Sequence, residues 1–265
     1  MKRIGYSSLT CSALLMIALA ATAFATPAPN GAKLDTRVFN DCPLSTLTPT
    51  NTYPASISIL DEMHPACVGF ANLHSWSFSE DGGATSSLFV NGSHFRMCAD
   101  VAIDGPGTGE GGLRFGPWWA PLVDGRFMIN ATSGEIACFG GRLPFYSFTA
   151  NHGITYTKGT TVHMEMTYMA NGLTSLSPAT IQYQIVVGGI TYNSPVLNYD
   201  EGNPAENPPY GLWGCLHDAM VGGYFQPRAN TGAALTCTWS NICFENLDVV
   251  PTESQTWGRL KTLYR

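Results

Sequence analysis

Short runs in which apolar and polar residues alternate recur along this chain, and this period of two constrains its fold more than any other feature. The clearest run covers 161–168, and two others cover 94–104 and 180–187. Because successive side chains of a strand point to opposite faces, each run predicts a strand with one buried and one polar face. The residues expected to point inward are Val162, Met164, Met166, Tyr168, Phe95, Met97, Ala99, Val101, Ile103, Ile181, Tyr183, Ile185 and Val187.

Weaker strand signals fill much of the remaining chain, between turns rich in glycine, asparagine and aspartate. The pair Gly188-Gly189, for example, predicts a hairpin turn into 190–192. About a dozen short strands with such turns, and no convincing internal helix, predict one all-β sandwich or barrel domain over 55–250. The weaker strands are expected at Ser56–Leu60, His74–Phe78, Ser87–Val90, Leu113–Phe115, Arg126–Ile129, Glu135–Phe139, Phe145–Phe148, Gly222–Gln226 and Leu235–Phe244.

The composition excludes several other classes of protein. Charged residues make up only 12% of the chain, about half the usual share of roughly a quarter. Coiled coils, helical bundles and charged disordered tails all need many more Glu, Lys and Arg residues. Composition and alternation therefore favour the same β-rich class.

The first 25 residues resemble a secretory signal peptide. Lys2 and Arg3 precede a largely apolar stretch, and Ala23-Phe24-Ala25 fits the small-x-small cleavage pattern. The alternative is an N-terminal membrane anchor, but the stretch is short for a bilayer core of about 30 Å. Cleavage predicts a secreted, periplasmic or cell-surface protein, and no later stretch is long and apolar enough for a membrane span.

The charge that remains after cleavage argues against nucleic acid as a partner. Removal of Lys2 and Arg3 leaves 11 basic against 19 acidic residues, and the basic ones are scattered. Binding to a phosphate backbone needs a concentrated basic surface.

Two segments flank the predicted domain. Residues 26–54 are rich in Pro and Thr, which predicts either a leader or an edge segment wrapped around the domain. Residues 251–265 form a basic C-terminal tail, in which Thr252 and Gln255 fit a helix capping box. The tail is therefore expected to be a short helix packed on the sandwich, or else a detachable segment.

Seven cysteines remain after the predicted cleavage, which in an exported chain indicates at most three disulfides and one leftover thiol. The absence of a Cys-x-x-Cys pair makes structural zinc unexpected. Cys237 and Cys243 would share one face of a continuous strand about 20 Å apart, too far to bond to each other unless a turn separates them. The seven are Cys42, Cys67, Cys98, Cys138, Cys215, Cys237 and Cys243.

Four ionisable side chains fall on the polar faces of two predicted strands. His163 and Glu165 lie on one of them, and Arg96 and Asp100 on the other. If the strands are neighbours, the four form one polar cluster with the two carboxylates that glycoside hydrolysis needs. The alternative is that they are solvated residues on the outer face of a sandwich.

The stretch Asp104–Gly112 is the most glycine-dense part of the chain. It lacks the ending of a phosphate loop, but Asp104 and Glu110 carry the oxygen ligands that Ca²⁺ prefers. The alternative is a plain flexible loop that holds no cofactor. The six histidines are scattered, so catalytic zinc is not expected.

Two adjacent tryptophans, Trp118 and Trp119, lie between Pro117 and Pro121. Aromatic faces stack on sugar rings because such contacts bury apolar surface at a low cost in entropy. These indoles, together with Asp100, are therefore candidate ligand-binding residues. The alternative is that both indoles plug one end of the sandwich.

The chain resembles the concanavalin A-like lectin/glucanase (LamG-type) jelly-roll superfamily over about residues 55–250. The resemblance is carried by His74-Ser75-Trp76-Ser77-Phe78-Ser79-Glu80-Asp81-Gly82-Gly83 and by Trp239-Ser240-Asn241-Ile242-Cys243-Phe244-Glu245. It implies an all-β, antiparallel two-sheet sandwich (jelly roll), with sugar binding on the concave face or in the end loops.

Catalytic members of this superfamily carry motifs that the chain matches only in part. The glucanase motif Glu-x-Asp-x-x-Glu is absent. Arg96, His163 and Tyr224-Phe225-Gln226 are similar to the Arg-rich, Gln-x-His and Tyr-containing strands of alginate-lyase jelly rolls, with Thr161 in place of the Gln.

These observations predict an exported, non-catalytic β-sandwich that binds a polysaccharide or cell-surface glycan or acts at the cell surface. The alternative is a polysaccharide-cleaving enzyme, a lyase or glycoside hydrolase, that uses Arg96, His163, Glu165 and Tyr224. A third hypothesis, a purely structural role, predicts neither binding nor turnover.

Overall fold

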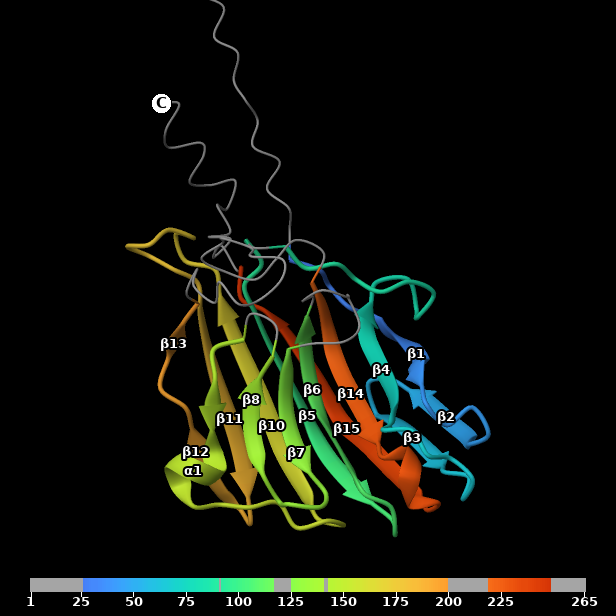
Figure 1. Cartoon of the computed structure of the whole chain (residues 1–265). Coiled ribbons are helices and arrows are strands. Elements are labelled where there is room, and N and C mark those ends of the chain that lie inside the picture. Colours follow the sequence, from blue (N-terminus) through green and yellow to red (C-terminus); the bar gives the residue numbers. More distant parts are fainter. Residues whose placement is uncertain (1–25, 91, 117–124, 141–142, 200–218, 249–265) are drawn as a thin grey trace, which may run out of the picture.

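Two antiparallel sheets face each other in the computed structural model, as Figure 1 shows. The structure describes residues 26–90, 92–116, 125–140, 143–199 and 219–248. The predicted signal peptide, the C-terminal tail, Trp118, Trp119 and Cys215 lie outside these ranges. The predicted all-β, two-sheet jelly-roll sandwich is confirmed.

Sheet A has seven strands, each hydrogen-bonded to its neighbours in antiparallel fashion. Their order across the sheet is β1 (Gly31–Asn40), β4 (Asn72–Ser79), β14 (Met220–Pro227), β6 (Gly109–Gly116), β7 (Arg126–Asn130), β8 (Ile136–Phe139) and β9 (Tyr146–Ser147).

Sheet B forms the second layer and is also antiparallel. Its order is β12 (Ile190–Asn193), β11 (Thr180–Val187), β10 (Thr161–Met169), β5 (Phe95–Asp104), β15 (Ala234–Asn246), β3 (Ser56–Glu62) and β2 (Thr46–Thr52), while the short β13 (Leu197–Asn198) pairs with β11. Within the described ranges the only helical elements are α1 (Phe148–His152) and a 3₁₀ turn at Ala229–Thr231. No helix among these residues is long and apolar enough to cross a membrane.

The hydrophobic core lies between the two sheets. The side chains expected to point inward from β5, β10 and β11 are buried, apart from the half-buried Val187. At the centre, Trp76 of β4 and Trp239 of β15 meet edge to face with ring centroids 6.2 Å apart. Full burial of each such side chain contributes about 2 kcal/mol or more, so this layer supplies most of the driving force for folding.

A bulge in β15 makes the expectation for Cys243 wrong. The pairing of β15 with β5 shifts between Ser240 and Cys243, where Asn241 takes a positive φ of 49°. One extra residue reverses the alternation, so Cys237 points into the core while Cys243 points outward and bonds to Cys98. The other described pair is Cys42–Cys67, and Cys138 and Cys237 are buried free thiols.

One segment follows one of its two sequence-based alternatives, and two others differ from their expectations. The edge-segment alternative holds for much of 26–54, because β1 and β2 are the outermost strands at one end of the two sheets. Pro49 is compatible with β2, since proline is tolerated on edge strands. The expected strand Ser87–Val90 is reduced to a single bridge at Phe89, and the glycine-rich stretch becomes strand β6 from Gly109 onward.

Candidate functional site

The outer face of sheet B brings together the four ionisable residues of the two predicted strands. His163 and Asp100 are paired directly across β10 and β5, with Nδ1 of His163 2.7 Å from Oδ1 of Asp100. Nε of Arg96 lies 4.0 Å from Oε2 of Glu165, and Arg96 also pairs with Glu245 of β15. The strands are therefore neighbours, and the expected polar cluster forms.

This cluster has the character of a solvated surface. The exposed fractions of the side chains are 45% for Arg96 and 32% for His163. Ion pairs at such exposure contribute about 0–1 kcal/mol because water screens them. The arrangement thus matches the solvated-face alternative.

Tyr224 does not join these residues, because β14 belongs to the other sheet. It points to the outer face of sheet A, where it packs with Leu73, Met128 and Ala137. The four candidate catalytic residues are consequently divided between opposite outer faces, and the structure does not bring Tyr224 together with Arg96, His163 and Glu165.

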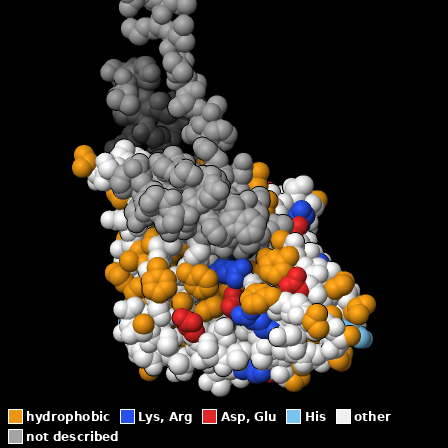
Figure 2. All heavy atoms as spheres, in the orientation of Figure 1, with side chains coloured by type: hydrophobic (Ala, Val, Ile, Leu, Met, Phe, Trp, Pro, Cys, Tyr) orange, Lys and Arg blue, Asp and Glu red, His pale blue; other side chains and the backbone are white. Residues whose placement is uncertain are grey.

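The outer face of sheet A carries a polar cluster of its own around Tyr224. Nη1 of Arg126 donates to Oε1 of Glu110 at 2.8 Å, and its guanidinium lies 4.9 Å from the centre of the Tyr224 ring. Nη2 of Arg114 donates to Oγ of Ser77 at 2.7 Å. We call Glu110, Arg114, Arg126 and Tyr224 the sheet A cluster. In Figure 2 Lys and Arg side chains lie beside Asp and Glu side chains near the middle of the visible face.

Register explains how these side chains reach one another. Gly222 of β14 lies directly between Ser77 of β4 and Arg114 of β6. Because glycine has no side chain, the long arginine can cross the intervening strand to the serine hydroxyl. The signal for this contact in the sequence is the glycine two residues before Tyr224.

Burial shifts the pKa values of two members of the sheet A cluster. The pKa of Tyr224 is raised well above its ordinary value, first by burial and then by the negative charge of Glu110. The pKa of Arg114 is lowered to about 10, first by burial and also by the positive charge of Arg126, against an opposing effect of Asp35. Tyr224 is therefore a neutral phenol at physiological pH, and Arg114 remains a cation.

The candidate Ca²⁺ ligands do not converge. Asp104 ends β5 in sheet B, and its Oδ1 accepts the N–H of Gly105 at 2.8 Å. Glu110 lies in sheet A and is paired with Arg126. Within the part of the chain that the structure describes, no group of three or more His, Cys, Asp or Glu side chains is arranged to hold a metal.

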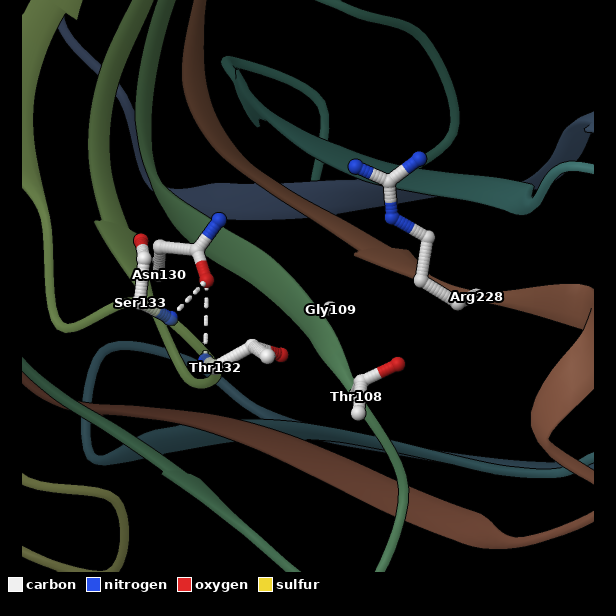
Figure 3. A pocket seen from close by; sticks show the side chains of 6 residues that line it. All are labelled: Thr108, Gly109, Asn130, Thr132, Ser133 and Arg228. Atoms are coloured by element: carbon white, nitrogen blue, oxygen red, sulfur yellow. Dashed lines mark hydrogen bonds between the residues drawn. The ribbon is translucent and has the colours of Figure 1, made fainter.

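An open pocket of about 250 Å³ lies at the end of the same outer face of sheet A. Figure 3 shows the strand that carries Gly109 in the middle of the pocket. Arg228 lies on one side of this strand and Asn130 on the opposite side, and the hydroxyls of Thr108 and Thr132 are nearby. We call it the Arg228 pocket. Its lining residues are Thr108, Gly109, Asn130, Thr132, Ser133 and Arg228.

The register of the strands places the pocket on the same outer face of sheet A as Tyr224. Gln226 of β14 is paired with Glu110 of β6, which in turn is paired with Asn130 of β7. Arg228 follows Gln226 by two residues, and its N–H donates to the carbonyl of Thr108 at 2.9 Å. The motif Tyr224-Phe225-Gln226 ends two residues before Arg228. The signal for Arg228 in the sequence is the same alternation, continued from Tyr224 and Gln226 by two residues.

Comparisons with solved structures return sandwich proteins at low identity. The alginate lyase Aly36B shares 13% identity, over 76% of this chain and 87% of that one, with a TM-score of 0.41. The carbohydrate recognition domain of Emp47p shares 9% identity over 82% and 89%, with a TM-score of 0.43. The cellulose induced protein Cip1 shares 12% identity over 81% and 91%, with a TM-score of 0.41.

No protein-family model matches the chain, and no curated protein matches it. The fold assignment therefore rests on the strand order and register of the chain itself: two antiparallel sheets packed into a jelly-roll sandwich.

Proposed function

We propose that this protein binds a polysaccharide on the outer face of sheet A, with the Arg228 pocket as the open part of the site, and that it does not cleave the polysaccharide. The observation that carries the proposal is the set of hydrogen-bonding groups that the pocket presents. Among the described residues, no protein partner engages the hydroxyls of Thr108 and Thr132 or the guanidinium edges of Arg228.

Sugars are suited to such a pocket because every ring carries several hydroxyl groups. A ligand hydroxyl can accept from the guanidinium and also exchange hydrogen bonds with the threonine side chains. Ligand sites are typically concave, with a few convergent polar groups that fix orientation. The pocket on the outer face of sheet A has this form.

The geometry supports binding over cleavage. Proton abstraction requires a base whose pKa lies near the working pH. Burial and Glu110 move the pKa of Tyr224 in the opposite direction, and His163 lies on the outer face of sheet B. A binding role therefore fits the described residues better than the enzymatic alternative.

Export supports an extracellular ligand. Stable disulfides are typical of secreted, periplasmic and cell-surface proteins, and the described residues contain two. We propose that residues 1–25 are removed as a signal peptide. Mass spectrometry of the exported protein tests this directly, and an intact N-terminus on the exported form would contradict it.

The binding proposal is tested by affinity electrophoresis of the full chain in gels that contain different polysaccharides. We expect one class of polysaccharide to retard the protein, and the double variant Thr108→Ala/Thr132→Ala to weaken that retardation by roughly tenfold, at about 1 kcal/mol or less per lost hydrogen bond. The matched variant Thr191→Ala on the exposed edge strand β12 should behave like the wild type.

Two outcomes would overturn the proposal. Retardation that is unaffected by the pocket variants but lost in Arg96→Gln would place the site on sheet B. Release of new reducing ends or unsaturated products from the retarding polysaccharide, abolished by Tyr224→Phe, would show cleavage instead of binding.

A further inference from the structure

We infer that the Arg228 pocket recognises a negatively charged oxygen group, a carboxylate or a sulfate ester, so that the polysaccharide is an acidic one. This inference rests on the proposed function for its site and adds the class of ligand. Three features support it: the charge of Arg228, the position of its guanidinium over an aromatic ring, and the hydrogen-bond donors around it.

The guanidinium of Arg228 is held in place by an aromatic ring. Its central carbon lies 3.9 Å from the centre of the Phe70 ring. The backbones on both sides are tied together, because Ala71 and Arg228 form a β-bridge and the N–H of Ala229 donates to the carbonyl of Phe70 at 3.0 Å. Stacking occupies the face of the guanidinium and leaves its edges, which carry the N–H groups, available to a ligand.

Arg228 has no counter-ion in the described part of the chain. Two acidic residues on neighbouring elements are engaged by other groups. Glu110, on the same outer face, pairs with Arg126 at 2.8 Å. Oδ2 of Asp41 accepts the N–H groups of Phe70 and Ala71 at 2.9 and 3.1 Å. The pocket therefore keeps the positive charge of Arg228.

The neighbouring groups of the pocket are mainly donors. Oδ1 of Asn130 accepts the N–H groups of Thr132 and Ser133 at 2.8 and 2.9 Å. These bonds fix the orientation of the amide, so the NH₂ group is what Asn130 offers to a ligand (Figure 3). The hydroxyls of Thr108 and Thr132 can each donate one further hydrogen bond and can also accept.

A donor-rich pocket distinguishes an oxyanion from a neutral hydroxyl. A carboxylate or sulfate oxygen accepts several hydrogen bonds at once, and bonds from a guanidinium to such oxygens are about twice as strong as neutral ones. A neutral sugar hydroxyl can exchange hydrogen bonds with the hydroxyls of Thr108 and Thr132, but it leaves the positive charge of Arg228 without a counter-charge. The chemistry of the pocket therefore favours an anion.

The size of the pocket limits what enters it. Its volume of about 250 Å³ is below the range of about 300–1,000 Å³ that encloses a drug-sized ligand. It holds one charged substituent and part of its ring, and the rest of the polysaccharide continues outside the pocket.

The test measures affinity for a polyuronate, a sulfated galactan and a neutral glucan of matched length, and in parallel for sodium sulfate and sodium acetate. It compares the wild-type full chain with three variants. We expect Arg228→Gln to lose roughly tenfold to a hundredfold in affinity for the acidic glycan that binds, as one charged hydrogen-bonding group contributes about 1.5–3 kcal/mol. Affinity for the neutral glucan should fall less, because there Arg228→Gln removes a hydrogen bond to a neutral oxygen and not to a charged one.

The two other variants separate charge from geometry. Arg228→Lys keeps the charge but lacks the planar fork, so it should recover only part of the affinity. Phe70→Leu keeps an apolar side chain but removes the stacking surface. It should lower the affinity for the acidic glycan less than Arg228→Gln does. Circular dichroism and thermal melting establish that each variant is folded.

The outcomes distinguish this inference from the proposed function. Equal binding of neutral and acidic glycans, unchanged by Arg228→Gln, overturns the inference and leaves polysaccharide binding intact. Failure of every glycan to bind overturns the proposed function. If sulfate or acetate alone then binds and Arg228→Gln abolishes this binding, the pocket takes a small free anion and the glycan assignment is wrong.

Discussion

His74 and Asp61 connect the two sheets through the interior of the sandwich, with Nε2 of His74 2.9 Å from Oδ2 of Asp61 and both side chains fully buried. His74 belongs to β4 and Asp61 to β3. Nδ1 of His74 accepts the N–H of Arg37 at 3.1 Å, so the proton of a neutral imidazole lies on Nε2 and is donated to the carboxylate. Asn72 donates to the same oxygen at 2.8 Å.

Replacing His74 with Ala should lower the free energy of unfolding by about 2–3 kcal/mol, because it leaves a buried carboxylate without one of its donors. His74→Gln keeps an N–H group on the side chain and should recover part of the loss. Urea denaturation of the three proteins measures the effect. A loss of similar size in both variants would indicate that ring packing, and not the hydrogen bond, determines the cost.

The pairing of His74 with Asp61 also predicts that the stability of the fold depends on pH. Burial by itself raises the pKa of the Asp61 carboxyl, but hydrogen bonds, that of His74 first, outweigh burial and the pKa is lowered below its ordinary value. The unfolded chain therefore binds this proton more tightly than the folded one. Asp61 contributes stability at pH values above its unfolded pKa of about 4, and that contribution is lost as the pH falls through the lower folded pKa.

Urea denaturation between pH 2 and 6 measures how the free energy of unfolding depends on pH. This range extends about two pH units to either side of the unfolded pKa of Asp61. The stability of Asp61→Asn should fall less steeply on acidification than that of the wild type. Parallel curves for the two proteins would assign the acid sensitivity to other carboxylates.

The two disulfides should differ in their contribution to stability. Cys98–Cys243 joins residues 145 apart and Cys42–Cys67 joins residues 25 apart. In the chain-entropy description, loops of these lengths restrict the unfolded state by roughly 5 and 3.5 kcal/mol. Denaturation of Cys98→Ala/Cys243→Ala and Cys42→Ala/Cys67→Ala should therefore show the larger loss in the first variant, and the reverse order would contradict the entropic account.

The thiols of Cys138 and Cys237 should be inert in the folded protein. Both side chains are buried, and burial raises the pKa of each thiol well above its ordinary value. Since the thiolate is the reactive form, iodoacetamide at neutral pH should modify neither residue until urea is added. Peptide mapping by mass spectrometry reads out the two positions, and modification of either one without denaturant would show that the core opens locally.

Gly223 should not tolerate even a methyl group. A Cβ atom at this position would lie 2.3 Å from Nε1 of Trp76 and 2.7 Å from Nε1 of Trp239. Gly223→Ala should therefore lower the free energy of unfolding by about 1–3 kcal/mol through overpacking. Gly92→Ala is the matched control, because a Cβ there meets no atom within 4 Å. Equal thermal stability of the two variants would mean that the indoles can move apart.

The alternation of residues was sufficient to predict which side chains β5, β10 and β11 bury. Each of these strands has one face toward the core, so the period of two in the sequence directly records the two environments. The hairpin at Gly188-Gly189 was likewise predictable, because both residues take the positive φ values that the turn requires.

Pairing between distant strands was not predictable in the same way. Strand β14 pairs with β6 and not with β10. This pairing depends on how the apolar faces of all the strands pack into one core, and no local sequence pattern specifies it. The bulge at Asn241 shows the same limit, since one extra residue reversed the orientation expected for Cys243. The Arg228 pocket also depends on distant pairing, as it joins residues from three strands or their adjoining loops.

The amino-acid sequence by itself determined the class of fold, the buried faces of its clearest strands and the polar character of their outer faces, because these follow from interactions between residues close together in the chain. Only the tertiary structure decided that Tyr224 and His163 lie on opposite outer faces, that His74 meets Asp61 inside the sandwich, and that Arg228 stands stacked and without a counter-ion among the described residues. These relationships arise from packing the two sheets together, and that packing is a property of the whole core.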